Sequence, residues 1–473
     1  MQKNRRKAQL TQITLHFKLY TLHLIKNNRL TEREYTENFS DIHPPFENKE
    51  AALLEANRCL FCYDAPCIKG CPTGINIPKF IKQISSDNLK GSANTIFISN
   101  IFGGGCARVC PVEKLCEGNC VFNLLDEKPI EIAKLQRWAT DRPLKEKWKM
   151  FNRKPSTGKR VAVVGAGPAG LSCAHALSRE GVDVTVFEKE TKGGGLMTYG
   201  VAAYKVTPAF CEQEVDFITS LGGIEIKYDQ ELGKHFSLEE LQREFDAVYL
   251  GIGVGLANPL NIPGEDLGGV ENAIEFIYQI RSNPFSTVKV GDKVVVIGLG
   301  MTAIDAATQS KRLGANEVTL VYRRSEAEKN CTQEELDIAL LDGCQIEWLA
   351  APKEIKGENG NVTKLIFERM RLGIPDHSGR PFPEPTGEFF ELETDMVVKA
   401  TGQSPYLEII DEASLENIRG KIVINENHAT NVNGVFAGGD AVNGGKEVVD
   451  AVQAGKEGGA AILDYLFSSR KDA

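Results

Sequence analysis

The sequence contains no apolar stretch long enough to cross a membrane and no surplus of positive charge. Even in residues 1–30 the apolar residues are interrupted by His16, Lys18 and His23, so no transmembrane helix is predicted. The 64 acidic residues outnumber the 55 basic ones, whereas recognition of nucleic-acid phosphates requires an excess of Lys and Arg. We therefore expect neither a membrane nor a nucleic acid as a partner.

The chain also lacks a recognisable export signal, which bears on the role of its twelve cysteines. In a secreted protein that number would indicate disulfides, but such proteins carry an export signal and are usually small. A chain of 473 residues is long enough for about three domains. We expect a cytoplasmic protein whose cysteines serve another purpose. Residues 1–44 are predicted to be a weakly ordered extension, and a presequence is the alternative, since the start is basic.

Eight of the twelve cysteines lie between Cys59 and Cys120, in two groups of four. The groups are Cys59, Cys62, Cys67 and Cys71, then Cys106, Cys110, Cys116 and Cys120. Four-cysteine zinc sites also use paired cysteines. The first group, however, is compact and ends in Cys-Pro, as a ferredoxin-type run does, although its middle spacer is longer. A second Cys-Pro follows at Cys110, and the pattern favours iron-sulfur clusters over zinc.

Helix-forming residues surround these cysteines. Residues 47–58 favour a helix that leads directly into the first cysteine. Pro78 is placed to start a second helix, and a third is expected over about residues 88–98. Gly103-Gly-Gly105 is expected to break that third helix. We predict a small helical domain over residues 45–150.

The composition changes after the polar segment of residues 152–159, where runs of Val, Ile and Leu begin to alternate with helix-forming segments. This alternation is typical of the α/β class with mostly parallel sheets. The expected strands are residues 160–164, 183–187, 246–250, 293–297, 317–321 and 396–400.

A glycine-rich fingerprint follows the first of these strands. Gly165, Gly167 and Gly170 come without a spacer and open a helix, as binding of a dinucleotide diphosphate requires. Glu188 ends the next strand, where it can accept hydrogen bonds from an adenosine ribose. Residues 434–440 resemble the second signature of flavoproteins, in which the Asp bonds the ribityl chain, so FAD is predicted. The expected FAD-binding residues are Gly165, Gly167, Pro168, Ala169, Gly170, Glu188, Lys189, Gly439 and Asp440.

A second fingerprint follows the strand at residues 293–297. No acidic residue ends the next strand, which finishes instead with Arg323 and Arg324. NAD sites place Asp or Glu there for the 2′-hydroxyl, whereas guanidinium groups suit a 2′-phosphate. The residues favour NADPH, with NADH as the alternative. The expected binding residues are Gly298, Gly300, Met301, Thr302, Ala303, Arg323 and Arg324.

The flavin region lacks the pair of closely spaced cysteines that other flavoproteins use to pass electrons to a disulfide. Between Leu171 and Phe210 only Cys173 occurs. Electrons are therefore expected to leave FAD by another route.

The cysteine segments and both fingerprints together resemble a known family. The motifs are Arg58–Cys67, Cys106–Pro111, Lys114–Cys116 and Ile132–Thr140, followed by the two nucleotide signatures. They are similar to the NAD(P)H-accepting part of dihydropyrimidine dehydrogenase over about residues 45–470. The resemblance is closest to the separate electron-input subunit of the bacterial two-subunit enzyme.

This resemblance implies two 4Fe-4S clusters with interleaved ligands. One cluster would use Cys59, Cys62, Cys67 and Cys120, and the other Cys71, Cys110, Cys116 and Gln136. Cys106 is left over and is expected to be a small buried residue. The similar small subunit of NADPH-dependent glutamate synthase typically has an acidic residue where Gln136 falls, and a neutral ligand should make the cluster easier to reduce. The alternative for Gln136 is an amide on a helix surface.

The resemblance also implies that Gly195 and Leu196 lie beside the flavin, although their glycine-rich loop could be a plain turn. Residues 328–331 depart from the Met-Pro pair that is common in relatives, so the sequence does not predict how the nicotinamide is bound. The expected domains after the helical one are an FAD-binding domain over residues 160–255 and 403–473 and, inserted within it, an NAD(P)H-binding domain over residues 256–402.

The predicted function is that of an electron-input subunit. A hydride from NAD(P)H would pass to FAD, and single electrons would pass through the two clusters to an FMN-containing catalytic subunit, in an assembly that could be a heterotetramer. That partner would reduce uracil or thymine to the 5,6-dihydro base, and no catalytic acid or base is expected in this chain. Two alternatives stay open: the glutamate synthase small subunit, which serves a glutamate-forming large subunit, and a redox-sensing interaction subunit.

Overall fold

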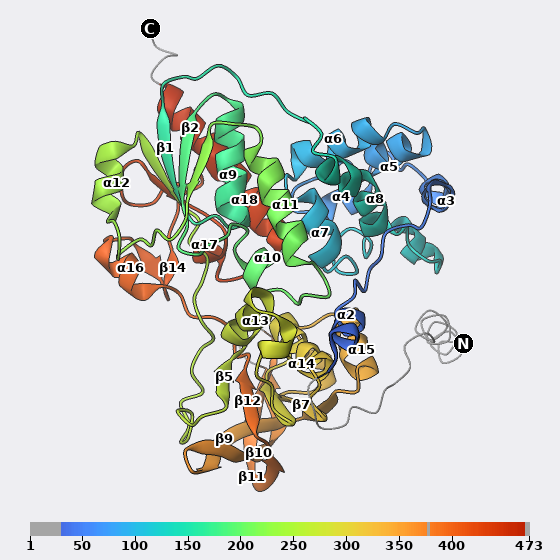
Figure 1. The fold of residues 1–473 in the computed structure, drawn as a ribbon, viewed down its shortest axis with the longest axis vertical. Helices are drawn as coiled ribbons and strands as arrows, with labels where there is room; N and C mark the ends of the chain where they lie inside the picture. Colours follow the sequence, from blue (N-terminus) through green and yellow to red (C-terminus); the bar gives the residue numbers. More distant parts are fainter. Residues whose placement is uncertain (1–29, 376–378, 469–473) are drawn as a thin grey trace.

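A computed structural model describes residues 30–375 and 379–468 and arranges them in three regions (Figure 1). A helical region, at the upper right of Figure 1, lies beside a first α/β unit, and a second α/β unit lies below them. The predictions for residues 1–29, a presequence or a weakly ordered extension, fall outside the described residues. So does the end of the predicted FAD-binding domain, residues 469–473.

The helical region follows the sequence prediction in its first three long helices. Its elements are α3 (Lys49–Arg58), α4 (Pro66–Lys69), α5 (Ile77–Ser85), α6 (Leu89–Ser99), α7 (Gly103–Val109), the 3-10 helix η1 (Val121–Leu125) and α8 (Ile132–Lys145). The expected helices are α3, α5 and α6. Each begins after an asparagine, Asn48, Asn76 or Asn88, whose side chain accepts a hydrogen bond from a backbone amide of the first turn.

The three glycines at 103–105 do not act as the sequence predicts. The third helix ends earlier, at Ser99 with Asn100 as its C-cap, and the glycines form the start of α7 instead. The reason is close packing: a Cβ at Gly103 would lie 2.4 Å from Cγ2 of Ile96, and one at Gly105 would lie 2.5 Å from Oε2 of Glu214. Glycine serves here as a small residue within a crowded helix contact.

The first α/β unit contains a five-stranded parallel sheet in the order β15-β4-β1-β2-β3. The strands are β1 (Arg160–Val164), β2 (Asp183–Phe187), β3 (Ile224–Lys227), β4 (Ala247–Leu250) and β15 (Val435–Ala437). The other elements are α9 (Pro168–Arg179), α10 (Leu196–Tyr199), α11 (Pro208–Thr219), α12 (Leu238–Glu244), α16 (Leu407–Glu412), β13 (Asn417–Ile418), β14 (Lys421–Ile422), α17 (Asp440–Asn443) and α18 (Val448–Phe467). Since β15 pairs with β4, two distant parts of the chain build this unit.

The second α/β unit contains another five-stranded sheet, in the order β5-β12-β6-β7-β8. The strands are β5 (Val270–Asn272), β6 (Lys293–Ile297), β7 (Glu317–Tyr322), β8 (Gln345–Trp348) and β12 (Met396–Lys399). Its helices are α13 (Ala273–Ser282), α14 (Met301–Arg312) and α15 (Gln333–Leu341), with the short 3-10 helices η2 (Phe285–Thr287) and η3 (Glu326–Glu328). The six strands expected from the sequence are β1, β2, β4, β6, β7 and β12, each within one residue of its predicted bounds. The α/β prediction is confirmed.

An antiparallel sheet at the bottom of Figure 1 is absent from the sequence prediction. It consists of β9 (Ala350–Glu358), β10 (Asn361–Pro375) and β11 (Pro381–Glu393). Leu365 and Phe367 alternate with less buried residues and pack with Ile355 in one buried cluster. Strands that bury one face alternate in this way, whereas the prediction used continuous apolar runs, which are typical of parallel strands buried on both faces.

The chain passes between the two α/β units twice, and the two crossings lie side by side. The backbone amide of Gly255 donates to the carbonyl oxygen of Ser404 at 2.7 Å, and that of Asn258 to Gly402 at 2.8 Å. We propose that the domain boundaries lie at these crossings, where the sequence predicts them. Among the described residues, no helix is long and apolar enough to cross a membrane.

Part of the predicted extension, residues 30–44, is a packed segment and not a weakly ordered one. Helix α2 (Glu32–Asn38) begins with a capping box in which Thr31 and Glu34 satisfy each other's backbone amides. The buried ring of Phe39 stacks on Phe285 of the second unit, with ring centroids 4.0 Å apart. The sequence did not reveal this because the aromatic partner lies far along the chain.

The helical region and the first α/β unit share one hydrophobic core. Phe97 of α6 and Phe217 of α11 have ring centroids 4.7 Å apart. Phe102 and Leu144 belong to the same buried cluster as Val161 of β1. The cysteine-bearing helices are therefore packed directly onto the unit that carries the first nucleotide fingerprint.

Candidate functional site

The first glycine fingerprint forms the turn between β1 and α9. Gly165 has a φ of +98°, and a Cβ there would lie 2.4 Å from the carbonyl oxygen of Gly251, so glycine is required. Gly167 is the N-cap of α9, and a Cβ built on it would approach nothing nearer than Cα of Gly195, 3.8 Å away in the described chain. The start of this helix is therefore open to a diphosphate, whose charge it would stabilise.

Three predicted FAD segments meet at the start of α9. A Cβ at Gly195 would lie 2.8 Å from Cα of Gly167, and one at Gly439 would lie 2.9 Å from Cβ of Ala169. Asp440 begins α17 directly after this contact, and burial raises its pKa. The predicted residues that the fold brings together here are Gly165, Gly167, Pro168, Ala169, Gly170, Gly195, Leu196, Gly439 and Asp440.

Glu188 and Lys189 follow β2 and have different partners. The two oxygens of Glu188 accept backbone hydrogen bonds from Ala166 at 2.7 Å and from Glu190 at 2.9 Å. Burial raises the pKa of this carboxyl. Each carboxylate oxygen can accept a second hydrogen bond, so Glu188 can fix the glycine loop and still accept a ribose hydroxyl. Lys189 is directed elsewhere, since its Nζ lies 3.0 Å from the hydroxyl of Tyr406.

The second fingerprint has the same form in the second unit. Gly298, with a φ of +128°, makes the turn after β6, and Gly300 is the N-cap of α14. No atom of the described chain lies within 4 Å of a Cβ built on Gly300. Met301, Thr302 and Ala303 form the first turn of the helix. A second helix start is thus open to a nucleotide diphosphate.

The two arginines after β7 lie in different surroundings. Arg323 is partly exposed, whereas Arg324 is buried and its Nε donates to the carbonyl oxygen of Pro381 at 3.1 Å. Partial burial lowers the pKa of Arg323, and the charges of Arg324 and Arg380 lower it further. Arg380 is a third basic residue that no sequence spacing could indicate, because the fold returns it to the end of β7. There it donates to the hydroxyl of Tyr322 at 3.0 Å.

Two cavities in the helical region are lined by all eight cysteines of the two sequence groups and by Gln136. The Gln136 cavity is lined by Cys71, Cys110, Cys116 and Gln136, with Cys106 as a fourth cysteine in its wall, and the all-cysteine cavity by Cys59, Cys62, Cys67 and Cys120. Ile77 belongs to the wall of both, so the cavities are neighbours. All the cysteines are free thiols. Each sequence group of four contributes to both cavities, which is the division that the resemblance implies; ligation itself stays a prediction.

The spacing of these sulfur atoms bears on the zinc alternative. Four thiolates around one zinc ion converge on bonds of about 2.3 Å. Among residues 30–375 and 379–468, no group of three Cys, His, Asp or Glu side chains converges closely enough to hold a single metal ion. The cysteines surround cavities instead, an arrangement that suits a larger iron-sulfur cluster.

Gln136 lies on α8 with the orientation of its amide fixed. Its Nε2 donates to the carbonyl oxygen of Gly103 at 2.6 Å. A carbonyl only accepts hydrogen bonds, so the nitrogen must be the atom on that side. The side chain is buried and lines the cavity. The alternative of an amide on the helix surface is therefore wrong, and the amide oxygen is the atom left for iron.

Each cavity has two thiols with a raised pKa: Cys59 and Cys67 in one, Cys110 and Cys116 in the other. Burial raises the pKa of Cys67 to about 12, and burial also raises that of Cys116. For Cys110 the main cause is a hydrogen bond with the thiol of Cys106, followed by burial. Such thiols are protonated at neutral pH, and ligation to iron would release their protons. Cys106 is buried, as predicted, and lies in the wall of the Gln136 cavity.

The Gln136 cavity faces the first α/β unit. Val449 of α18 completes its wall. Lys456 of the same helix donates to the carbonyl oxygens of Thr73 at 3.4 Å and Ser99 at 3.0 Å. From α11, buried Glu214 accepts a hydrogen bond from the amide of Gly105 at 2.8 Å. Two helices of the predicted FAD-binding unit thus reach this side of the helical region.

The all-cysteine cavity has an exposed apolar residue, Leu60, in its wall. Its wall comes entirely from the helical region. Leu60, Tyr63, Leu124 and Leu125 are near neighbours of its cysteines in the sequence, and all four are more than half exposed. Apolar groups that gather on a surface mark sites of contact with other proteins. We call these four residues the apolar rim.

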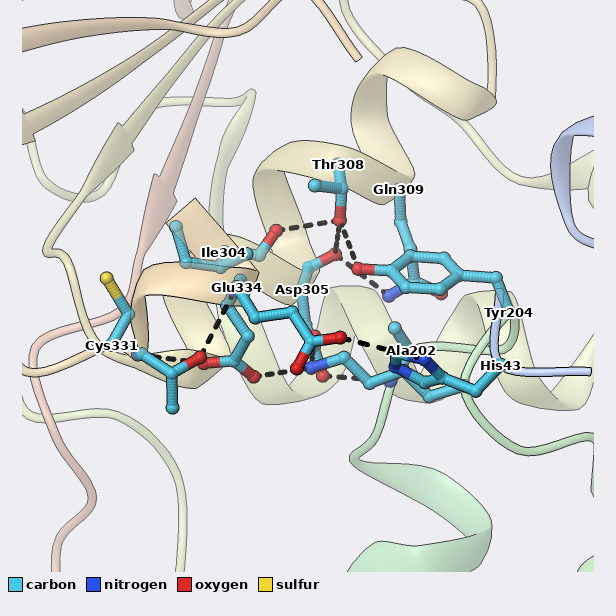
Figure 2. Close-up of polar contacts among 12 residues, drawn as sticks. His43, Ala202, Tyr204, Ile304, Asp305, Thr308, Gln309, Cys331 and Glu334 are labelled. Atoms are coloured by element: carbon cyan, nitrogen blue, oxygen red, sulfur yellow. Dashed lines mark hydrogen bonds and ion pairs between the residues drawn. The ribbon is translucent and has the colours of Figure 1, made fainter. Parts of the chain in front are cut away.

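A buried ion pair joins the loop after α10 to the second α/β unit, among the polar contacts of Tyr204, Asp305 and Thr308 that Figure 2 draws. Nζ of Lys205 lies 2.6 Å from Oδ1 of Asp305 on α14 and 2.6 Å from Oε1 of Glu335 on α15. Beside it, the hydroxyls of Tyr204 and Thr308 share a hydrogen bond of 2.8 Å. Burial alone would lower the pKa of Lys205, but the two carboxylates raise it well above its usual value. These contacts fix the two nucleotide units relative to each other.

Two protein families match the chain. The family described as pyridine nucleotide-disulphide oxidoreductase matches residues 159–455. The family described as dihydropyrimidine dehydrogenase domain II, 4Fe-4S cluster, matches residues 35–148. The two matches cover the nucleotide units and the helical region, respectively.

Curated relatives and solved structures are also similar to the chain. NAD-dependent dihydropyrimidine dehydrogenase subunit PreT of Salmonella typhimurium is 34% identical over 436 residues, 91% of this chain and 98% of that protein. The small chain of NADPH glutamate synthase of Escherichia coli is 33% identical over 449 residues, 90% of this chain and 94% of that protein. FprA of Mycobacterium tuberculosis in complex with NADPH has a TM-score of 0.57 and 23% identity, over 67% of this chain and 86% of that one. At this identity the structural likeness shows the fold alone.

Proposed function

The chain belongs to the pyridine nucleotide-disulphide oxidoreductases, and from this premise we propose that it is the electron-input subunit of a two-subunit dihydropyrimidine dehydrogenase. It is an oxidoreductase with an N-terminal 4Fe-4S domain, and its cofactors are FAD, iron-sulfur clusters and a nicotinamide nucleotide. The proposal adds the destination of the electrons. They would pass to an FMN-containing partner that reduces uracil or thymine to the 5,6-dihydro base.

One observation carries the proposal: the two cavities lie in series between the first α/β unit and the surface. Val449 of α18 lines the Gln136 cavity, Ile77 lines both cavities, and Leu60 of the apolar rim lines the all-cysteine cavity. An electron that enters beside α18 would therefore leave near the apolar rim. We propose that the catalytic partner docks there.

The residues of the chain bind and orient in this scheme, and none of them needs to act as an acid or base. FAD, when bound, converts a two-electron hydride into single electrons. The start of α9 and Glu188 would hold its diphosphate and ribose, and the start of α14 would hold the nicotinamide nucleotide. The Lys205 ion pair keeps these two sites in a fixed relation.

We propose NADPH, rather than NADH, as the preferred nucleotide. Arg323, Arg324 and Arg380 gather where β7 ends, and their charge suits a 2′-phosphate. An Arg323→Glu variant should lose the preference for NADPH, measured as the ratio of kcat/KM values for the two nucleotides. Arg243→Glu, an exposed reversal on α12, is the matched control. An unchanged ratio in Arg323→Glu would remove the basis for this choice.

The alternative of a glutamate synthase small subunit rests on a specific observation, the 33% identity to such a chain over most of both lengths. Gln136 argues against it, because those subunits resemble this chain in cysteine spacing but typically have an acidic residue at that place. A redox-sensing role would not require two open nucleotide-binding helix starts.

The decisive experiment is anaerobic reduction of the native complex after co-purification. With the pyrimidine function, NADPH bleaches FAD, the partner contains FMN, and oxidation of NAD(P)H depends on uracil. Turnover of 2-oxoglutarate that depends on glutamine would establish the glutamate synthase alternative instead. If neither NADPH nor NADH bleaches FAD, electron input by this chain is ruled out.

A further inference from the structure

Asn100 is a buried polar residue for which the proposed electron path has no role. It ends α6, and its side chain is 1% exposed. Within the described part of the chain, neither Nδ2 nor Oδ1 has a hydrogen-bond partner. Burial of an amide without partners is costly. The residue is therefore expected to bond a group that is not part of the polypeptide.

The position of Asn100 indicates which group that is. Together with Cys71, Cys110, Cys116 and Gln136, Asn100 lines the Gln136 cavity. Its backbone is fixed on both sides, since its amide donates to the carbonyl oxygen of Ile96 at 2.8 Å and its carbonyl accepts from Gly103 at 3.1 Å. The side chain is thus held at the cavity wall, at the junction of α6 and α7.

We propose that Nδ2 of Asn100 donates a hydrogen bond to a sulfur atom of the cluster in the Gln136 cavity and thereby raises the reduction potential of that cluster. The inference rests on the proposed function, which places a cluster there. Thiolate and sulfide sulfur atoms accept hydrogen bonds, so the cluster would select the nitrogen of the amide and not its oxygen. Reduction adds negative charge to the cluster, and a donor stabilises the more negative state.

Direct ligation by Asn100 is not needed. Cys71, Cys110, Cys116 and Gln136 already offer one ligand for each of four iron atoms, and Cys106 lies in the same wall. Thr73 would supply a second donor near the same cluster: its Oγ1 lies 3.3 Å from Sγ of Cys71, and a thiolate ligand can only accept. Asn100 is thus a positioning residue that acts on the cluster through a hydrogen bond.

The test is a redox titration of the holoenzyme monitored by electron paramagnetic resonance. Asn100→Leu removes the donor at similar volume. We expect its equilibrium constant for reduction of the Gln136-cavity cluster to fall about tenfold, or about 59 mV for a one-electron couple. The potential of the other cluster should stay unchanged. A variant that lacks Cys67 identifies which signal belongs to which cavity.

Two further variants keep the result interpretable. Asn100→Asp keeps the shape but replaces the donor with an acceptor, so the same potential should fall at least as far. Thr95→Val, a buried polar change on the same helix, should leave both potentials unchanged, because Oγ1 of Thr95 bonds Gln83 and not the cavity.

The outcomes separate the inference from the function on which it rests. A wild-type protein with only one cluster would contradict the proposed function. If both Asn100 variants keep two clusters and neither cluster changes its potential, the role of Asn100 is overturned. The proposed function is not affected by that result. Loss of one cluster from both Asn100 variants, with flavin retained, would also overturn that role, because the residue would then be a ligand or a structural support. A lower potential in Asn100→Leu, matched or exceeded in Asn100→Asp, supports the inference. A fall in Asn100→Asp alone would overturn it, because the added charge lowers the potential without any loss of a donor.

Discussion

The Gln136 cavity and the all-cysteine cavity share Ile77 but differ in the chemistry of their walls. The Gln136 cavity adds two neutral amides, Gln136 and Asn100, to its cysteines. Apart from its four cysteines, the all-cysteine cavity has only apolar residues in its wall: Leu60, Ala65, Pro66, Ile77, Pro78, Ile81, Val121, Phe122, Ile130 and Ile132. Ligand charge and hydrogen bonds to sulfur tune cluster potentials. We therefore expect the cluster in the Gln136 cavity to be the easier one to reduce.

The cavities also differ in the parts of the protein that lie next to them. The Gln136 cavity contacts α18 of the flavin unit, whereas the apolar rim lies beside the all-cysteine cavity. In the proposed electron path, the Gln136 cavity would receive electrons and the all-cysteine cavity would release them. The two cavities thus differ both in the polarity of their walls and in their position. The following substitutions test each difference on its own.

Loss of the all-cysteine cluster should have the largest effect. Cys67→Ala should remove the cluster of the all-cysteine cavity only, because Cys67 lines that cavity alone. FAD should still be reduced by NADPH at the normal rate, while electron delivery to the partner falls to background. Iron content and stopped-flow flavin absorbance measure both. Cys106→Ala is the control and should keep two clusters; loss of the Gln136-cavity cluster from Cys67→Ala would show that the ligands are divided differently.

Removal of the buried carboxyl of Glu214, which contacts α7 of the helical region, should change how protein stability depends on pH. Burial raises the pKa of Glu214 from 4.5 to about 7. The stability that the protonated form contributes is present below the unfolded value near 4.5 and is lost as pH rises through about 7. As pH rises from acid to mildly alkaline, the free energy of unfolding of Glu214→Gln should therefore increase relative to that of the wild type by up to about 3 kcal/mol. Parallel melting curves of the two proteins across that range would contradict the assignment.

A charge on the amide ligand should reduce the difference between the cavities. Gln136→Glu supplies an anionic oxygen in place of a neutral one, so the potential of its cluster should fall. We expect about a tenfold smaller equilibrium constant for reduction, or about 59 mV. The all-cysteine cluster in the same sample serves as the internal reference. An unchanged potential would mean that Gln136 does not bind iron.

The smallest effect is expected at the apolar rim. Tyr63→Ser should weaken binding of the partner by roughly tenfold or less, because a single exposed aromatic residue is removed from a larger contact. Cluster potentials should not change. Phe389→Ser, an exposed aromatic on β11, is the matched control and should bind the partner normally. Equal binding by both variants would place the partner elsewhere.

The sequence could predict those parts of the protein whose signals are local. The run Val161–Val164 leads directly into Gly165, and the neighbouring residues suffice to indicate a strand, a turn and a helix. The resemblance also anticipates how seven of the cysteines divide between the two cavities, although Cys71 and Cys120 each leave their sequence group; it does not anticipate Cys106 in the wall of the Gln136 cavity.

The remaining features depend on contacts between distant segments. Phe39 is buried only because Phe285 is there to stack on it, and Arg380 reaches β7 only through the folding of β10 and β11. Asn100 carries no spacing signal at all. Its place in the cavity wall follows from where α6 ends, and its unpaired atoms can be recognised only in three dimensions.

The buried Lys205 has a consequence for the mechanics of the molecule. Separation of the two nucleotide units would leave one cation and two carboxylates without partners, at a cost of about 3–5 kcal/mol for a broken buried pair. The units should therefore melt as one cooperative block in a calorimeter. The same contacts would oppose any swing of the second unit relative to the first, so the two nucleotide sites should keep a constant separation.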